Sequence, residues 1–167
     1  MFAMPLAAQA ASYTYIDQKA PYSNPSPSML TALNQPKIGT TFKVQVPESG
    51  RSISWCWCMW AHCPPYCPYW DPYEYRFSYL AIGVRNPNVT IPALGGFLFT
   101  SAEVVMLTPW RNEILTWGSV TMSFAIPDSR ELVGLKFYQQ VLVQSYLPDW
   151  NPSYRRLSRG GVGVVGK

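Results

Sequence analysis

The stretch GSVTMSFAIPDSRELVGLKFYQQVLVQS, residues 118–145, decides the fold because two runs of period two flank one polar turn. One face of the first run is hydrophobic and consists of Val120, Met122, Phe124 and Ile126. The second run alternates in the same way, with one face made of Phe137, Gln139, Val141 and Val143. Period two is typical of β-strands, whose successive side chains point to opposite faces. The stretch therefore predicts strands over residues 114–126 and 132–144, joined by the IPDS turn.

Strand signals of this kind recur along the chain, between turns rich in proline, glycine and asparagine. Further strands are predicted over residues 13–16, 40–47, 75–84, 96–107 and 157–165. A single helical turn is expected near residues 29–33, and no segment carries a helical stripe of ten or more residues. Six or more strands joined by short turns predict an all-β chain. We expect a single antiparallel β-sandwich of Greek-key or jelly-roll type.

Composition places the chain among exported proteins of one domain. Of the 167 residues 48% are hydrophobic and only 13% are charged, about half the usual charged share. The net charge of +4 comes from 13 basic and 9 acidic residues spread along the chain. Nucleic-acid binding needs a coherent basic stripe, so we expect no nucleic-acid partner. No run approaches the roughly 20 apolar residues of a membrane span, and none is expected.

The N-terminus has features of an export signal. Ala8 and Ala10 form the A-x-A pattern that signal peptidase recognises, after a short apolar run. We interpret residues 1–11 as a signal-peptide remnant, with an ordinary alanine-rich N-terminus as the alternative. Residues 12–36 are rich in proline and turns, and are expected to form an extended arm ahead of a domain over residues 37–167.

Several phrases in order resemble one known module. They are QPKIGTTFKVQV, YLAIGVRN, IPALGGFLFTSAEVVML, SFAIPDSRELVGLKFYQQ and LSRGGVGVVG. Together they resemble a family of small, largely uncharacterised exported β-sandwich proteins of planctomycete type, whose members have a strand, an IPxDxxLVG turn and an xFYxQ strand. The resemblance implies a sandwich fold and export to the cell surface or beyond. It implies no activity, since the family offers no established chemistry.

This chain departs from that family pattern in its cysteines. Family members commonly carry one cysteine after the first tyrosine-rich strand and another in a GGC phrase. Here the second phrase reads GGFLF, with Phe97 at the cysteine position, and the first cysteine is also absent. The chain instead has an insertion over residues 52–75, where the family usually has a short loop. The insertion contains the segment WCWCMWAHCPPYCPYW, residues 55–70.

The insertion holds all four cysteines of the chain, Cys56, Cys58, Cys63 and Cys67. Their spacing differs from the paired CxxC knuckles of structural zinc sites. Disulfides form and persist in exported proteins, so we expect two disulfides here, with connectivity left open among three pairings. A zinc or copper site and free or intermolecular thiols are the alternatives. No metal or other cofactor is expected.

The insertion is also crowded with aromatic residues. Ten of the chain's twenty-five aromatics fall between residues 55 and 79. Those expected at a binding interface are Trp55, Trp57, Trp60, Tyr66, Tyr69, Trp70 and Tyr73. Phe77 and Tyr79 follow on a predicted core strand and are expected to belong to a small satellite core around the disulfides. So many large rings exceed what a short loop can bury, and exposed rigid aromatics mark binding surfaces.

These features favour a non-enzymatic extracellular structural or adhesive protein. The aromatic loop would contact another copy or another extracellular protein, and the N-terminal arm could pair with the sheet edge of a neighbour. A carbohydrate-binding module is the first alternative, and a metal-binding module at the cysteines is the second. The only histidine, His62, lies beside Cys63, but adjacency alone gives no catalytic geometry and no catalytic residue is assigned. The NVT sequon at Asn88 receives no role.

Overall fold

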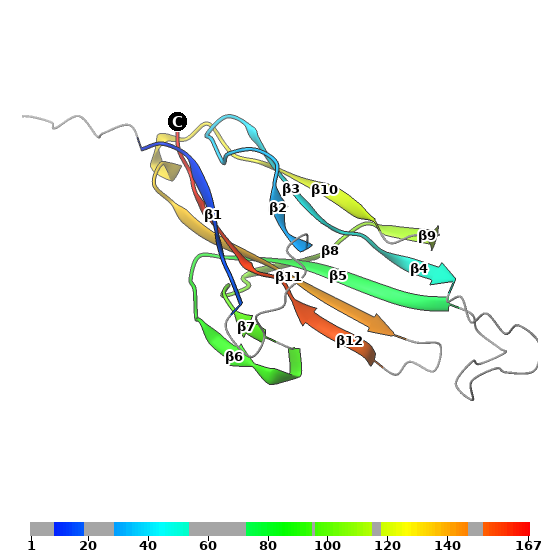
Figure 1. Ribbon diagram of the computed structural model, residues 1–167. Helices are drawn as coiled ribbons and strands as arrows, with labels where there is room; N and C mark the ends of the chain where they lie inside the picture. The colour runs from blue at the N-terminus through cyan, green and yellow to red at the C-terminus, as the bar shows by residue number, and fades with distance from the viewer. Residues whose placement is uncertain (1–8, 19–28, 54–72, 95, 115–117, 147–151) are drawn as a thin grey trace, which may run out of the picture.

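The computed structural model describes residues 9–18, 29–53, 73–94, 96–114, 118–146 and 152–167. This part of the chain contains thirteen strands and two short 3₁₀ helices, η2 (Pro92–Leu94) and η3 (Arg130–Leu132), with no α-helix (Figure 1). None of the helices in these ranges is long and apolar enough to cross a membrane. The predicted all-β character is confirmed.

The main sheet has eight strands in the order β1-β13-β11-β5-β4-β9, with β12 beside β11 and β8 beside β5. Their bounds are β1 Ser12–Ile16, β4 Ser49–Ile53, β5 Tyr73–Gly83, β8 Val104–Leu107, β9 Trp110–Ile114, β11 Lys136–Tyr146, β12 Pro152–Leu157 and β13 Gly160–Val164. Pairing is antiparallel throughout, except between β4 and β9, which run parallel. The eleven-residue strands β5 and β11 form its centre.

Two smaller sheets accompany the main one. Strands β2 (Thr31–Ala32), β3 (Thr41–Pro47) and β10 (Ser119–Ala125) form a three-stranded antiparallel sheet in the order β10-β3-β2. Strands β6 (Val89–Ile91) and β7 (Gly96–Leu98) form an antiparallel pair of their own. The chain thus passes from the three-stranded sheet to the main sheet between β3 and β4.

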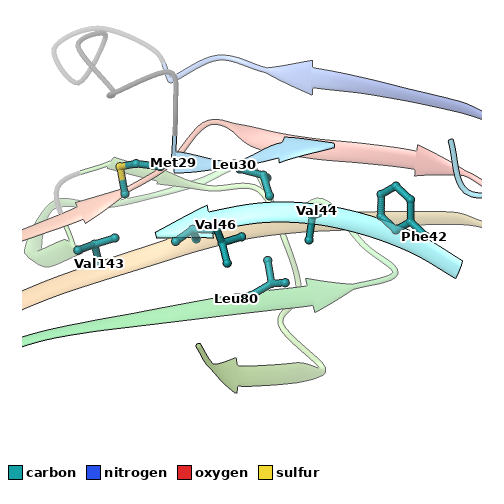
Figure 2. Close-up of a cluster of buried hydrophobic side chains, with 8 residues drawn as sticks. Met29, Leu30, Phe42, Val44, Val46, Leu80 and Val143 are labelled. Atoms are coloured by element: carbon teal, nitrogen blue, oxygen red, sulfur yellow. The ribbon is translucent and has the colours of Figure 1, made fainter. Parts of the chain in front are cut away.

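The hydrophobic core lies between the three-stranded sheet and one face of the main sheet (Figure 2). The alternation in β3 buries every second side chain, while the residues between them stay largely exposed. The buried cluster consists of Met29, Leu30, Phe42, Val44, Val46, Leu80, Val141 and Val143. Burying one such valine, leucine or phenylalanine side chain contributes about 1.5–3 kcal/mol to stability. The apolar side chains that recur at every second position of the strands therefore form the core.

The predicted strands match the structure best where one face is buried. Residues 40–47 correspond closely to β3, whereas the strand predicted over residues 132–144 begins four residues before β11 and ends two residues before its end. Three predicted strands each span parts of two observed strands. Residues 96–107 cover β7 and β8, residues 114–126 cover the end of β9 and then β10, and residues 157–165 cover the end of β12 and then β13. In the first two cases the chain changes sheet within the predicted strand, which a run of β-forming residues does not reveal.

The described part of residues 12–36 belongs to the domain and differs from the expected arm. Strand β1 pairs along its length with β13 of the same chain, from Ser12 opposite Val164 to Ile16 opposite Gly160. Met29 and Leu30 are buried members of the core. The expected boundary at residue 37 therefore does not separate an arm from the domain, because this segment supplies an edge strand and core side chains.

Aromatic rings lie over the glycine-rich strand β13. Phe137 stands directly opposite Gly163 in the β11–β13 register, and a Cβ atom at Gly163 would overlap its ring. Tyr13 lies over Gly161 and donates a hydrogen bond to Gln139 Oε1 at 2.8 Å. Burial raises the pKa of Tyr13, so its phenol remains a neutral donor. Glycine at these positions makes room for the rings.

We expect Gly163→Ala to destabilise the protein by about 1–3 kcal/mol, because the added methyl group must displace the Phe137 ring in a packed core. Urea denaturation would measure the change in the free energy of unfolding. Thr14→Ala, on the exposed side of the adjacent strand β1, is the matched control and should change stability far less. Equal stability of Gly163→Ala and the native protein would contradict this packing.

Candidate binding face

The two faces of the main sheet differ in what covers them. Leu80 of β5 and Val141 of β11 belong to the core beneath the three-stranded sheet. Because side chains alternate along a strand, Phe77 and Tyr79 point to the opposite face, which we call the outer face. On that face Tyr79 stands opposite Leu107 of the neighbouring strand β8. The outer face therefore carries aromatic and aliphatic side chains of its own.

Five of these side chains form a surface that we call the outer patch, made of Phe77, Val105, Leu107, Trp110 and Tyr146. The Phe77 ring lies 5.3 Å from the Trp110 ring and meets the Tyr146 ring edge-on at 5.8 Å, measured between centroids. Trp110 is 39% exposed and Leu107 is 46% exposed. Aromatic pairs at these distances are stabilising, so the patch is an ordered apolar surface open to solvent in the described structure.

A buried carboxylate holds the strand that bears Trp110. Glu48 lies between β3 and β4, with its side chain 2% exposed, and its Oε2 accepts from Arg111 Nη1 at 3.0 Å. Its other oxygen, Oε1, accepts from the backbone N–H of Gly118 at 2.9 Å. Arg111 follows Trp110 in β9, and its own side chain remains 68% exposed. A buried carboxylate needs such partners, so Glu48 fixes β9 against the sheet.

A buried hydroxyl network fixes the turn between β8 and β9 on the same side. Ser49 Oγ and Thr108 Oγ1 lie 2.7 Å apart, and Ser49 Oγ also accepts from the backbone N–H of Ser78 at 2.9 Å. The Thr108 N–H donates to the Ser78 carbonyl at 2.9 Å, and Ser78 Oγ donates to the Glu48 carbonyl at 3.2 Å. Ser49, Ser78 and Thr108 are all buried. Satisfied networks of this kind are rigid, so Leu107 and Trp110 are held in place from below.

The other half of the outer face is covered by strand β7. There the side chains of two buried glutamines make the backbone hydrogen bonds that a neighbouring strand would otherwise make. The Phe97 N–H donates to Gln18 Oε1 at 2.7 Å, and the Phe99 N–H donates to Gln140 Oε1 at 2.9 Å. The Nε2 atoms of Gln18 and Gln140 donate to the Ser158 carbonyl at 2.7 and 2.9 Å. Side-chain amides thus satisfy the backbone of β7 and of Phe99 just after it, while the outer patch has no such cover among the described residues.

Most of the residues predicted for the interface lie outside the described part of the chain. These are Trp55, Trp57, Trp60, Tyr66, Tyr69 and Trp70, together with Cys56, Cys58, Cys63 and Cys67. The backbone of Tyr73 begins β5, opposite Ile53 of β4. The disulfides therefore remain a prediction.

Phe77 and Tyr79 are not members of the main core cluster, and the satellite core expected around the disulfides stays a prediction because the cysteines lie outside the described residues. Leu80 of the same strand is a core residue, so these two rings stand on the opposite face, where both are half-buried. Leu107, Trp110 and Tyr146 were missed as candidate residues. The sequence around Trp110, PWRN, is typical of a turn, and only the place of Trp110 beside Phe77 identifies it as a candidate.

The side chains of the outer patch are aromatic and aliphatic. The outer patch has no carboxylate, histidine or thiol among its five side chains. Within the described ranges, no three His, Cys, Asp or Glu residues gather where they could hold a metal ion. What the patch offers is flat aromatic area on a rigid sheet, which is suited to apolar or stacking contacts.

Comparison with family models, with curated proteins and with solved structures gives no match for this chain.

We expect Arg111→Met to destabilise the protein by about 1–3 kcal/mol, because it leaves the buried Glu48 carboxylate without its charged partner. The free energy of unfolding in urea would measure this. The double variant Glu48→Gln with Arg111→Met is the matched comparison, and its loss should be smaller than the sum of the two single losses. Additive losses would show that the two side chains are not coupled.

Proposed function

We propose that this chain is an exported, non-enzymatic structural or adhesive module that attaches through an aromatic surface. The observation that carries the proposal is the outer patch, where Phe77, Leu107, Trp110 and Tyr146 form an ordered apolar surface on rigid strands. Tryptophan and tyrosine are enriched at protein interfaces because they bury much area at low entropic cost. The low charge content and the resemblance to exported proteins support export.

The aromatic insertion of residues 52–75 enters this proposal by the position of its ends. Strand β4 ends at Ile53 and β5 begins at Tyr73, and these two residues are register partners. Tyr73 lies four positions before Phe77 on β5, roughly 13 Å along the strand. We therefore propose that the insertion and the outer patch act together in binding, because the insertion joins β5 close to Phe77. Ser12–Ile16 pair within the chain, so the proposal does not use an arm that reaches a neighbour.

In its finer detail the proposed fold is a β-sandwich of Greek-key or jelly-roll type whose insertion is braced by disulfides. The packing of the three-stranded sheet over the main sheet supports two layers. Two disulfides among Cys56, Cys58, Cys63 and Cys67 would each restrict the unfolded chain. Such bracing keeps an insertion rigid, as a binding surface requires.

Carbohydrate binding is the second candidate, favoured by one observation. Trp110 is partly exposed and its ring is held by Phe77. A fixed, open indole ring can stack against the apolar face of a sugar. This candidate differs from the first in the partner and not in the surface used.

Trp110→Ala should weaken attachment about thirtyfold or more if the outer patch carries binding, as expected for an interface residue worth about 2 kcal/mol. The measurement is a biosensor titration of the protein over immobilised copies of itself and over a panel of cellulose, chitin and other polysaccharides. Leu107→Ala should weaken the same interaction. Leu135→Ala is the matched control, because Leu135 is as exposed as Leu107 but is not part of the patch.

The panel separates the two candidates. Binding to immobilised copies that depends on Trp110 supports the structural role, whereas binding to a polysaccharide alone supports the carbohydrate module. Native protein that binds neither, or binding that Trp110→Ala leaves unchanged, would reject a function of the outer patch.

Thiol titration of the denatured protein should find no reactive thiol before reduction and four after it, because all four cysteines are expected in disulfides. Metal analysis of the native protein is the companion measurement. Four titratable thiols together with bound zinc or copper would replace the disulfide proposal with the metal-binding alternative.

A further inference from the structure

Strand β8 has an apolar edge that lies at the border of the main sheet. It pairs with β5 on one side, and none of the described strands pairs with its other side. Its sequence is VVML, and Val104, Val105 and Leu107 are each about half exposed. An uncovered strand edge presents unpaired backbone N–H and C=O groups, and proteins commonly protect such edges with charges, prolines or bulges. Residues 104–107 contain neither a charge nor a proline.

The other outer strands of the main sheet look different. Strand β12 carries the exposed Arg155 and Arg156, and β9 carries the exposed Arg111 and Asn112. Strand β1 has the exposed Thr14 at its centre. Charged or polar residues at these positions discourage pairing with another sheet. Among the described outer strands of this sheet, β8 is therefore the one whose composition favours pairing.

We propose that β8 pairs antiparallel with β8 of a second copy of this chain, about a two-fold axis, and joins two main sheets into one. This inference rests on the proposed structural role and names its partner. A two-fold axis closes the assembly as a dimer, since each copy uses its one β8 edge. Adding a strand to an exposed sheet edge is a common mode of protein recognition.

The sequence of β8 is complementary to itself in this arrangement. Directly opposed residues of an antiparallel pair place their side chains on the same face of the sheet. With Met106 opposite Met106 of the second copy, Val105 lies opposite Leu107 on the outer face. Val104 then lies opposite Thr108 on the core face. Apolar side chains thus meet across the outer face of the pair, and the two outer patches become continuous through Val105 and Leu107.

Charges at the two ends of the edge are also complementary. Glu103 precedes β8 and Arg111 lies beyond its other end, in β9. Antiparallel pairing brings the Glu103 end of each copy toward the Arg111 end of the other. Hydrogen bonds from the Ser101 hydroxyl and the Val84 N–H lower the pKa of Glu103, so it stays ionised. The exposed part of the Arg111 side chain is available for the opposite charge.

The border of the main sheet is not straight where β8 lies. Strand β9 pairs with β4, which together with β8 borders β5, so β9 lies one strand further out than β8. The edge is therefore stepped, and β8 occupies the recess. The partner's β8 would lie in line with β9, one strand outward from β8 of the first copy. By the two-fold symmetry, β8 of the first copy would take the same position relative to β5 of the partner.

Sedimentation velocity of the full chain over a wide range of concentrations tests the proposal. The native protein should form a dimer, and Val105→Lys should raise the dissociation constant at least about tenfold, because it places a charge within the pair. Val105 is 56% exposed, so lysine is tolerated in the single copy, which a thermal unfolding curve can verify. Val89→Lys, at a position that is 50% exposed on β6, is the matched control and should leave the dimer intact.

Met106→Cys tests the register directly. Cysteines at opposed positions of paired strands are close enough for a disulfide, so mild oxidation should link two copies through position 106. Mass spectrometry of the linked peptides distinguishes this bond from any bond formed by the native cysteines. Val89→Cys should give no such link.

A native protein that stays monomeric, or a dimer that Val105→Lys leaves unchanged, overturns the β8 pairing. A dimer without linkage at position 106 overturns the register with Met106 at the axis. The proposed function fails separately, when the biosensor shows no attachment that depends on Trp110. Monomeric protein with attachment that depends on Trp110 would thus reject the pairing and keep the function.

Discussion

Glu48 is the side chain on which the two sheets and the outer patch jointly depend. It is buried where the chain leaves the three-stranded sheet for the main sheet, and its carboxylate joins Arg111 of β9 to the N–H of Gly118, just before β10. An ionised carboxylate buried without partners costs several kcal/mol, so the fold is stable only with these bonds made. The requirement fixes β9, and with it Trp110, at the border of the sheet.

Polar groups also explain why only half of the outer face is open. Gln18 and Gln140 bond the backbone of β7 and the Ser158 carbonyl, which allows β7 to cover the sheet without pairing with it. The outer patch offers rings and aliphatic groups where that half offers amides, and none of the described strands covers it.

The sequence predicted the strands that have one apolar face. It missed strands and side chains whose positions depend on contacts with residues far away in the sequence. In β3, β10 and β11 apolar residues recur at every second position because one face of each strand is more buried than the other. The alternation of period two therefore predicted these strands. Strand β4 was missed because it is rich in serine and glycine and shows no apolar alternation. Its Ser49 is buried, and hydrogen bonds satisfy the Ser49 hydroxyl. Both faces of β5 carry hydrophobic residues, so alternation could not decide between Phe77 and Leu80 as core residues. The candidate interface was predicted from the insertion, and Trp110 needed the fold to be seen.

The outer patch and the β8 edge share Val105 and Leu107, which makes attachment and self-association interdependent. Pairing of two β8 strands would join two patches into one surface and place two sets of rings on one rigid sheet. A large partner that contacts both sets gains from the second contact at little further entropic cost. By thermodynamic linkage, such a partner would stabilise the dimer by the same factor that the dimer strengthens attachment. A module of one domain could in this way hold a surface firmly through contacts that are individually weak.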